Sequence, residues 1–312
     1  MDFTDDAIVL SIRRHGESDA ILSALTRQNG RHLGLVKAGA SRRQRAVLEI
    51  GNRLKVHWRA RLAEQLGNFQ VELVTSVSSG LFDDPLRLAA LASACAVADI
   101  VLPEREPHED VFTATTELIA AIVGGAPLER ATPTPPSPNL GEGEESEARR
   151  PAASEREPHA LQSPPPSWGR APSANADLVG VEGVAGSEDA SDSADTPWPA
   201  AYVRWELDLL ASLGFGLDLS HCAATGETRD LAYVSPKTGR AVGREAGRPY
   251  VDRLLVLPPF LTAADGAPDI ADLMAGLRLT GYFLDRHVLH GPNTDRRLEA
   301  RARFVERLAV QP

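Results

Sequence analysis

The segment RLKVHWR at residues 53–59 alternates polar and apolar side chains. Successive side chains of a β-strand point to opposite faces, so this alternation indicates a strand with one buried face. Trp58 is expected on the buried face, because its apolar neighbours follow the same period. The cations of the segment are expected partly on the solvent face, with the register slipping by one between Lys55 and Arg59.

Similar patterns lie on both sides of this segment. The other predicted strands span residues 7–12, 19–26, 32–38 and 66–77. Turn signals separate them at HGES, residues 15–18, and at QNG, residues 28–30. Several short strands within residues 1–80 predict a small closed barrel, and five is the strand number of an OB-fold. The count alone would also suit an SH3-like barrel.

The pattern changes after residue 80. Asp83, Asp84 and Pro85 are typical of a helix start, and apolar residues from Leu86 to Val101 recur at roughly helical spacing. Residues 81–127 and 198–312 are therefore assigned to an α-helical domain, and the chain to the α+β class. The further predicted helices span residues 109–123, 199–213, 270–289 and 295–309.

Residues 128–197 differ in composition from the rest of the chain. They hold 11 of the 23 prolines and one aromatic residue, Trp168, and their 13 acidic residues face five arginines. Such a segment cannot bury enough apolar surface to offset the entropy of ordering it, so a disordered insertion is predicted. One interpretation is an acidic tail that mimics DNA or recruits a partner. We favour a tolerated surface insertion, because long insertions cost little entropy.

Positive charge is concentrated in the predicted barrel. The chain has a formal net charge of −10, whereas residues 13–61 contain twelve Lys or Arg against three Asp or Glu. A basic module in an acidic protein predicts contact with a polyanion such as the phosphate backbone of DNA. The alternative is an ordinary solvated barrel surface. The candidate DNA-binding residues are Arg13, Arg14, Arg27, Arg31, Lys37, Arg42, Arg43, Arg45, Arg53, Lys55 and Arg59, and Arg61 extends the same series.

The segment GASRRQR at residues 39–45 is expected to be a flexible, strongly cationic loop. Mobile positive charge of this kind suits a groove that follows a phosphate backbone. Few aromatic residues accompany it, since the barrel has only Phe3, Trp58 and Phe69 besides its histidines. Binding is therefore expected to be mainly electrostatic, sensitive to salt and indifferent to base sequence.

No catalytic or metal-binding set is recognisable in the sequence. The histidines are not accompanied by a serine or cysteine in a nucleophile-like turn, and the glycine pairs do not match a phosphate-binding loop. Cys222 and Thr225, followed by Ser235 and Thr238, have the spacing of a zinc knuckle, but hydroxyls are poor zinc ligands. We therefore predict a protein that is not an enzyme and has no metal or cofactor.

Other classes of protein are disfavoured by composition. Cys95 and Cys222 are too few for a disulfide scaffold, which fits a reducing compartment. The N-terminal sequence MDFTDDAIVL lacks the basic residues of a secretory leader, and no apolar run is long enough to cross a membrane. A cytoplasmic protein is expected.

Several short segments, in a fixed order, carry a family resemblance. In the N-terminal part they are AIVL at 7–10, GESD at 16–19, GRHLGLVKAGA at 30–40 and the arginine segment. In the second part they are WELDLLASLGF at 205–215 and DLSHCAATG at 218–226. Their order and spacing resemble the RecO family of bacterial recombination mediators, over nearly all of the chain outside residues 128–197.

The resemblance implies an OB-fold and a helical domain with a zinc-knuckle-like insert at residues 220–260. It implies a mediator that binds single- and double-stranded DNA, anneals strands and helps load RecA onto DNA coated by single-strand-binding protein. RecR is an implied partner, and the nucleoid an implied location. The helical domain is expected to hold the acidic C-terminal tail of single-strand-binding protein, with the basic candidates Arg204, Arg278, Arg286, Arg296 and Arg297.

The chain departs from the family pattern in two places. Thr225, Ser235 and Thr238 stand at three of the four positions where the family carries zinc-binding cysteines, so the knuckle is expected to be degenerate and free of metal. The long segment at residues 128–197 is also unusual for the family.

Two other functions remain compatible with a basic barrel. One is an OB-fold RNA-binding factor in ribosome or tRNA metabolism, which would prefer structured RNA over single-stranded DNA in competition binding. The other is a DNA-processing nuclease, which would show metal-dependent cleavage of plain DNA.

Overall fold

The computed structural model of the chain describes residues 1–62, 65–77, 80–81, 83–124, 197–262, 268–288 and 295–310. The predicted insertion at residues 128–197 therefore lies, apart from Pro197, outside the described residues. Within the described part, no helix is both long enough and apolar enough to cross a lipid bilayer.

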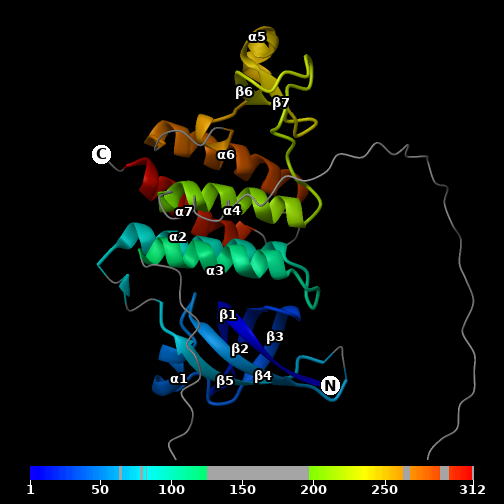
Figure 1. The fold of residues 1–312 in the computed structure, drawn as a ribbon. Helices are drawn as coiled ribbons and strands as arrows, with labels where there is room; N and C mark the ends of the chain where they lie inside the picture. Colours follow the sequence, from blue (N-terminus) through cyan, green and yellow to red (C-terminus); the bar gives the residue numbers. More distant parts are fainter. Residues whose placement is uncertain are drawn as a thin grey trace, which may run out of the picture. The chain divides into compact units, whose positions relative to one another are not determined.

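Five strands form a closed barrel at the N-terminal end of the chain (Figure 1). Their order around the barrel is β1-β2-β3-β5-β4, with β3 and β5 parallel and the other neighbours antiparallel. A short helix, α1, lies between β3 and β4. The predicted OB-fold is confirmed. The elements are β1 Asp2–His15, β2 Asp19–Thr26, β3 Gly30–Val36, α1 Arg42–Val47, β4 Arg53–Arg59 and β5 Asn68–Thr75.

Two details of the barrel differ from the sequence-based expectation. The side chains of β4 alternate between buried and more exposed positions over its whole length, so there is no slip between Lys55 and Arg59. Residues 39–45 are not entirely a loop, because α1 begins at Arg42. Ser41 caps this helix by accepting a hydrogen bond from the backbone N–H of Gln44. A serine followed by residues with good helix propensity favours such a start.

Strand β1 is buried on both faces, which explains its continuous apolar run. Ala7 and Val9 belong to the core inside the barrel. Ile8 and Leu10 point outward and join the core of the helical part, together with Leu25 of β2. A strand covered on both sides needs apolar residues at every position rather than an alternation.

The helical part packs against this outer face of the barrel. Helix α2 begins at Pro85, and the Asp84 side chain caps it by accepting from the N–H groups of Leu86 and Arg87. Gly124 ends α3 in the left-handed conformation. Predicted and observed helices agree closely, except that α6 ends at His287. The helices are α2 Pro85–Val101, α3 Glu109–Val123, α4 Trp198–Ser212, α6 Ile270–His287 and α7 Asp295–Ala309.

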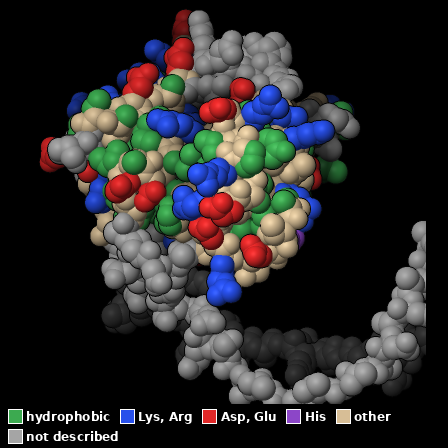
Figure 2. All heavy atoms as spheres, turned by 90° about the horizontal axis from the view of Figure 1, so that it is seen from above, with side chains coloured by type: hydrophobic (Ala, Val, Ile, Leu, Met, Phe, Trp, Pro, Cys, Tyr) green, Lys and Arg blue, Asp and Glu red, His purple; other side chains and the backbone are tan. Residues whose placement is uncertain are grey.

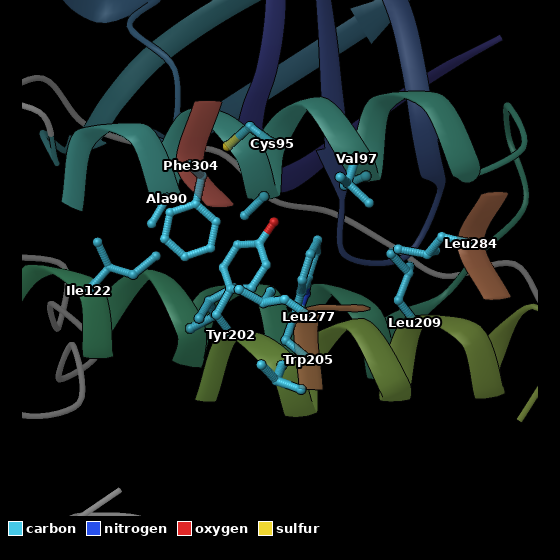
Figure 3. Packing of buried hydrophobic residues seen from close by; sticks show 14 of the residues in the cluster. Ala90, Cys95, Val97, Ile122, Tyr202, Trp205, Leu209, Leu277, Leu284 and Phe304 are labelled. Carbon is cyan, nitrogen blue, oxygen red and sulfur yellow. The ribbon is translucent and has the colours of Figure 1, made fainter. Parts of the chain in front are cut away.

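The core between these helices is rich in aromatic side chains. Tyr202 of α4 and Phe304 of α7 face one another with ring centroids 4.6 Å apart (Figure 3). The Tyr202 hydroxyl lies 2.6 Å from the Ser93 hydroxyl of α2, so its polar atom is satisfied although the residue is fully buried. These contacts tie three helices into one core.

A small sheet occupies the region where the knuckle was predicted. Its strands are arranged in the order β7-β6-β8, and β6 is antiparallel to both neighbours. The elements are β6 Leu231–Val234, β7 Ala241–Gly243, α5 Arg244–Gly247, the 3-10 helix Arg248–Arg253, β8 Leu255–Val256 and the 3-10 helix Pro259–Leu261.

Candidate nucleic-acid interface

At one end of the barrel, the β1–β2 turn is hydrogen-bonded to the segment that follows β3. The backbone N–H of Ala40 donates to the Ser18 carbonyl oxygen at 2.8 Å, and the N–H of Ala38 donates to the Asp19 carboxylate at 2.9 Å. The Cβ of Ala20 lies so close to Gly39 that no side chain would fit there. The β1–β2 turn and the segment after β3 therefore form a joint surface.

Six exposed cations lie on and beside this surface. Arg13 and Arg14 end β1, Lys37 follows β3, and three arginines project from α1. Among the described residues none of the six has an ion-pair partner. Their charge is therefore available to a ligand. This group, Arg13, Arg14, Lys37, Arg42, Arg43 and Arg45, is called the arginine tip below.

A buried amide anchors α1 within the tip. Asn52 is fully buried, and its Nδ2 donates to the carbonyl oxygens of Ala46 and Val47 at the end of α1. Its Oδ1 accepts from the N–H of Val77. Leu48, directly after α1, is buried in the barrel core. The helix is thus held at its C-terminal end while its arginines face solvent.

The cations of β4 are partly neutralised by their neighbours. Lys55 Nζ lies 3.3 Å from a carboxylate oxygen of Asp6, and Glu72 of β5 is its partner on the other side. Arg59 pairs in register with Asp2. The acidic residues opposite these cations lower the positive electrostatic potential along β4. The predicted candidates Arg53, Lys55 and Arg59 are thus solvent-accessible to varying degrees, whereas all six cations of the arginine tip are exposed.

Two predicted DNA contacts are instead engaged between barrel and helices. Arg31 donates to the Leu102 carbonyl oxygen at 2.8 Å, and its guanidinium lies 3.5 Å from the buried carboxylate of Asp99 and 3.7 Å from Glu104. Arg27 lies over the Phe112 ring at 4.8 Å and 3.8 Å from Glu109. Sequence alone could not separate these two, because their partners lie far away in the chain.

Phe3, Trp58 and His32 of the barrel form a largely buried ring cluster. Trp58 is buried, as predicted, and its indole N–H reaches the carbonyl oxygens of Leu33 and Leu66. Phe3 stacks on Trp58 with centroids 5.4 Å apart, and His32 meets both rings edge-on. Burial and the nearby Arg105 guanidinium lower the pKa of His32. Because Trp58 and His32 are buried and Phe3 is only partly exposed, this cluster presents little ring surface to a base.

The residues of the degenerate knuckle do not fit zinc. Cys222 is buried, and its Sγ accepts a hydrogen bond from the Gly243 N–H at 3.2 Å. Burial acts to raise the pKa of this thiol, but the Thr225 hydroxyl and the N–H groups of Gly243, Ala224 and Thr225 outweigh it and lower the pKa to about 7. The sulfur is satisfied by protein groups. One thiolate with hydroxyl neighbours is not a zinc donor set.

One Ser-His-Asp grouping lies at the start of this region. Ser220 Oγ is 2.7 Å from Asp218 Oδ1 and 2.8 Å from His221 Nδ1. The Arg240 guanidinium contacts the other ring nitrogen, Nε2, at 2.9 Å. A catalytic histidine places serine and carboxylate on opposite nitrogens, whereas here both lie on the same one. The grouping fastens a turn to Arg240 instead.

Two models of one protein family match this chain. The family model "Recombination protein O N terminal" matches residues 1–77, and "Recombination protein O C terminal" matches residues 189–297. The chain belongs to the RecO family. The suspected resemblance is thereby confirmed, and a general role in DNA repair follows from it.

The RecO relatives match over nearly their whole length. A "DNA repair protein RecO" of Rhodospirillum centenum is 43% identical over 311 residues, covering 98% of this chain and 94% of the relative. That of Rhodospirillum rubrum is 42% identical, covering 99% and 96%, and that of Phenylobacterium zucineum is 39% identical, covering 99% and 98%. Residues 128–197 therefore fall within the length shared with these RecO proteins.

Charge on this RecO chain is not uniform. Figure 2 shows the face nearest α5, where acidic and basic side chains are intermixed with hydrophobic ones and neither sign dominates. The arginine tip differs, because its six cations are clustered on fastened turns and one short helix.

Proposed function

We propose that this protein is a non-enzymatic recombination mediator that grips single- and double-stranded DNA with the arginine tip. The observation that carries the proposal is the group of six exposed cations without ion-pair partners among the described residues. Family membership supports a role in DNA repair. On this basis the protein would act at the nucleoid in the cytoplasm.

The chemistry of the tip favours phosphate rather than base recognition. Arginine binds phosphate oxygens in a forked geometry, and each neutralised phosphate releases counterions. In the described part of the barrel, Phe3, Trp58 and Phe69 are not exposed. Cations that screen two strands from one another would also promote annealing, because the repulsion between backbones is reduced. This supports annealing of complementary strands and, indirectly, loading of RecA.

A groove in the helical part suits an acidic protein tail. It has a volume of about 410 Å³ and lies between α6 and α7, with Leu277, Leu284 and Val305 among its apolar residues. Arg278 lines it and is exposed. Apolar walls beside a cation would accept the acidic C-terminal tail of single-strand-binding protein. Among the other basic candidates, Arg204 and Arg286 donate to the carbonyl oxygens of Phe260 and Pro236. RecR as a partner rests on family membership alone.

The salt dependence of DNA binding tests the proposal. Changing Arg42, Arg43 and Arg45 to Ala should weaken binding of an oligonucleotide and lower the slope of log K against log salt, by about 0.7 for each lost single-strand phosphate contact. The matched control replaces Arg244, Arg248 and Arg253 with Ala, which removes the same charge from exposed positions around α5. An unchanged slope in the first variant would overturn the assignment of the tip. A strong preference for structured RNA would favour the RNA-binding alternative.

A further inference from the structure

Two exposed rings are stacked at the ends of α4 and α6. Phe215 follows α4 and is 39% exposed, and its ring lies nearly parallel to the His287 imidazole, with centroids 4.9 Å apart and 13° between planes. His287 is also parallel to Phe283, at 6.0 Å and 8°. Phe283 is buried. The three rings form a stack that begins in the core and ends in solvent, called the ring stack below.

The backbone fixes Phe215 in place. The N–H of Gly214 donates to the Ala211 carbonyl oxygen, and the N–H of Phe215 donates to that of Leu210. Gly214 has φ 85°, the left-handed conformation that glycine adopts readily. This is the Schellman arrangement that ends many helices. A ring held by a helix end loses little entropy when a ligand stacks on it, because its position is already set.

The other side of the ring stack is equally well supported. Phe283 and His287 are four residues apart on α6 and so share one face of the helix. The turn at Gly239 lies next to Phe283, since a Cβ added to this glycine would be 3.8 Å from the Phe283 ring. The stack is therefore a built feature of the described fold rather than a chance exposure of one side chain.

Cations border the ring stack. Arg286 precedes His287, and its guanidinium contacts the Pro236 carbonyl oxygen at 3.2 Å, which brings the exposed Lys237 to the same end of α6. Asp218, which lies near this turn, is paired with Arg240 at 3.3 Å. Asp285 lines the groove between α6 and α7 instead. Within the part of the chain that the structure describes, Arg286 and Lys237 have no ion-pair partner. Single-strand binders use exposed rings to stack bases and neighbouring cations to contact phosphates.

From this arrangement we propose that the ring stack is a second nucleic-acid site, where an unpaired base stacks on Phe215 while Arg286 and Lys237 contact the adjoining phosphates. The proposal rests on the proposed function, which makes DNA the ligand. The exposed Phe, Tyr or Trp residues in the described part are Phe215 and Tyr250, and only Phe215 belongs to a stack. The expected ligand is single-stranded DNA of any sequence, because every base has a stacking face.

A base-dependent binding measurement tests the ring stack. We would compare the full-length protein with its Phe215→Leu variant, which keeps an apolar side chain at the helix end but removes the aromatic face. Each is titrated into a labelled oligo-dT and into a strand of equal length without bases. The variant should bind oligo-dT about tenfold more weakly, and the base-free strand equally well. The salt slope should not change, and Phe215→Trp should retain the affinity.

The control is Tyr250→Leu, which removes an aromatic ring of 57% exposure that is not stacked. It should leave oligo-dT binding unchanged. If the wild-type protein binds no DNA, the proposed function fails. If it binds DNA but Phe215→Leu is as tight as wild type on oligo-dT, only the ring-stack proposal is overturned. Weaker binding of single-strand-binding protein with unchanged DNA affinity would also overturn it, since the face would then serve a protein.

Discussion

Arg301 donates two hydrogen bonds to the Glu206 carboxylate inside the helical core, from Nε to Oε1 at 2.6 Å and from Nη2 to Oε2 at 2.8 Å. Glu206 is fully buried in α4, and Arg301 reaches it from α7. The Thr280 hydroxyl of α6 donates to the same carboxylate. Three helices thus meet at one buried charge, which must remain paired because its desolvation is costly.

Removing the arginine should therefore destabilise the helical part. We expect Arg301→Met to lower the free energy of unfolding by about 3–5 kcal/mol, measured by urea denaturation, because Glu206 is left without a cation. The exposed Arg303 of the same helix provides the control, and Arg303→Met should change it by less than about 0.5 kcal/mol. The double variant Glu206→Leu with Arg301→Met should recover much of the loss. If Arg301→Met and Arg303→Met lowered the free energy of unfolding equally, the stabilising role of the Arg301–Glu206 pair would be contradicted.

Arg31 should behave as a structural residue and not as a DNA contact. Arg31→Met leaves the buried Asp99 carboxylate without its guanidinium, so we expect a loss of about 1.5–3 kcal/mol in the free energy of unfolding. The salt slope of DNA binding should stay at the wild-type value, measured where the variant is fully folded. Arg43→Ala should do the reverse, with normal stability and a lower slope. A lower salt slope of DNA binding in the Arg31→Met variant would instead indicate that Arg31 contacts DNA.

The buried imidazole of His32 should make the fold sensitive to acid. Burial and Arg105 lower its pKa in the folded state, whereas in the unfolded chain it titrates near 6.5. Below that value the unfolded state binds a proton that the folded state resists, so stability falls as the pH drops. His32→Leu should flatten the dependence of the unfolding free energy on pH between 5 and 7. From pH 7.5 to 8.5 the unfolding free energies of the wild type and His32→Leu should change in parallel with pH. If they also change in parallel between pH 5 and 7, His32 is not the source of the acid sensitivity.

The domain assignment leads to a deletion experiment. We propose that residues 128–197 are not required by the rest of the fold, because Gly124 ends α3 in the left-handed conformation and α4 buries side chains such as Tyr202 and Trp205 in the core. Replacing them with a flexible Gly-Ser linker should leave a cooperative thermal transition within about 4 °C of wild type. The DNA salt slope should be unchanged. A non-cooperative transition would show that the segment contributes to the core.

Local patterns predicted the elements of the fold well. The alternation in β4 and the Asp-Pro start of α2 depend on neighbours in sequence, and both were confirmed. Strand β1 is longer than predicted, since residues Asp2 to Asp6, three of which are acidic, pair with β4 and no local pattern reveals this pairing. Helix α1 was interpreted as a loop because a six-residue helix offers too short a period to recognise.

The candidate site was less accessible to sequence reasoning. The net charge of the barrel indicated a phosphate-binding surface, but it could not show which cations are already paired. Arg27 and Arg31 are engaged with Glu109 and Asp99, and Lys55 with Asp6. The ring stack could not be predicted either, because its rings come from distant parts of the sequence. Phe215 and His287 lie 72 positions apart, and the sequence around neither residue points to the other.

The double burial of β1 bears on how this protein can be taken apart. Ile8, Leu10 and Leu25 belong to the helical core although they are borne by the barrel, and each would cost about 1.5–3 kcal/mol if returned to water. A fragment that ends at residue 80 would thus expose an apolar stripe on a basic barrel. Such an exposed apolar patch makes aggregation expected. The barrel is therefore best studied within the full-length chain, because its outer face also forms part of the helical core.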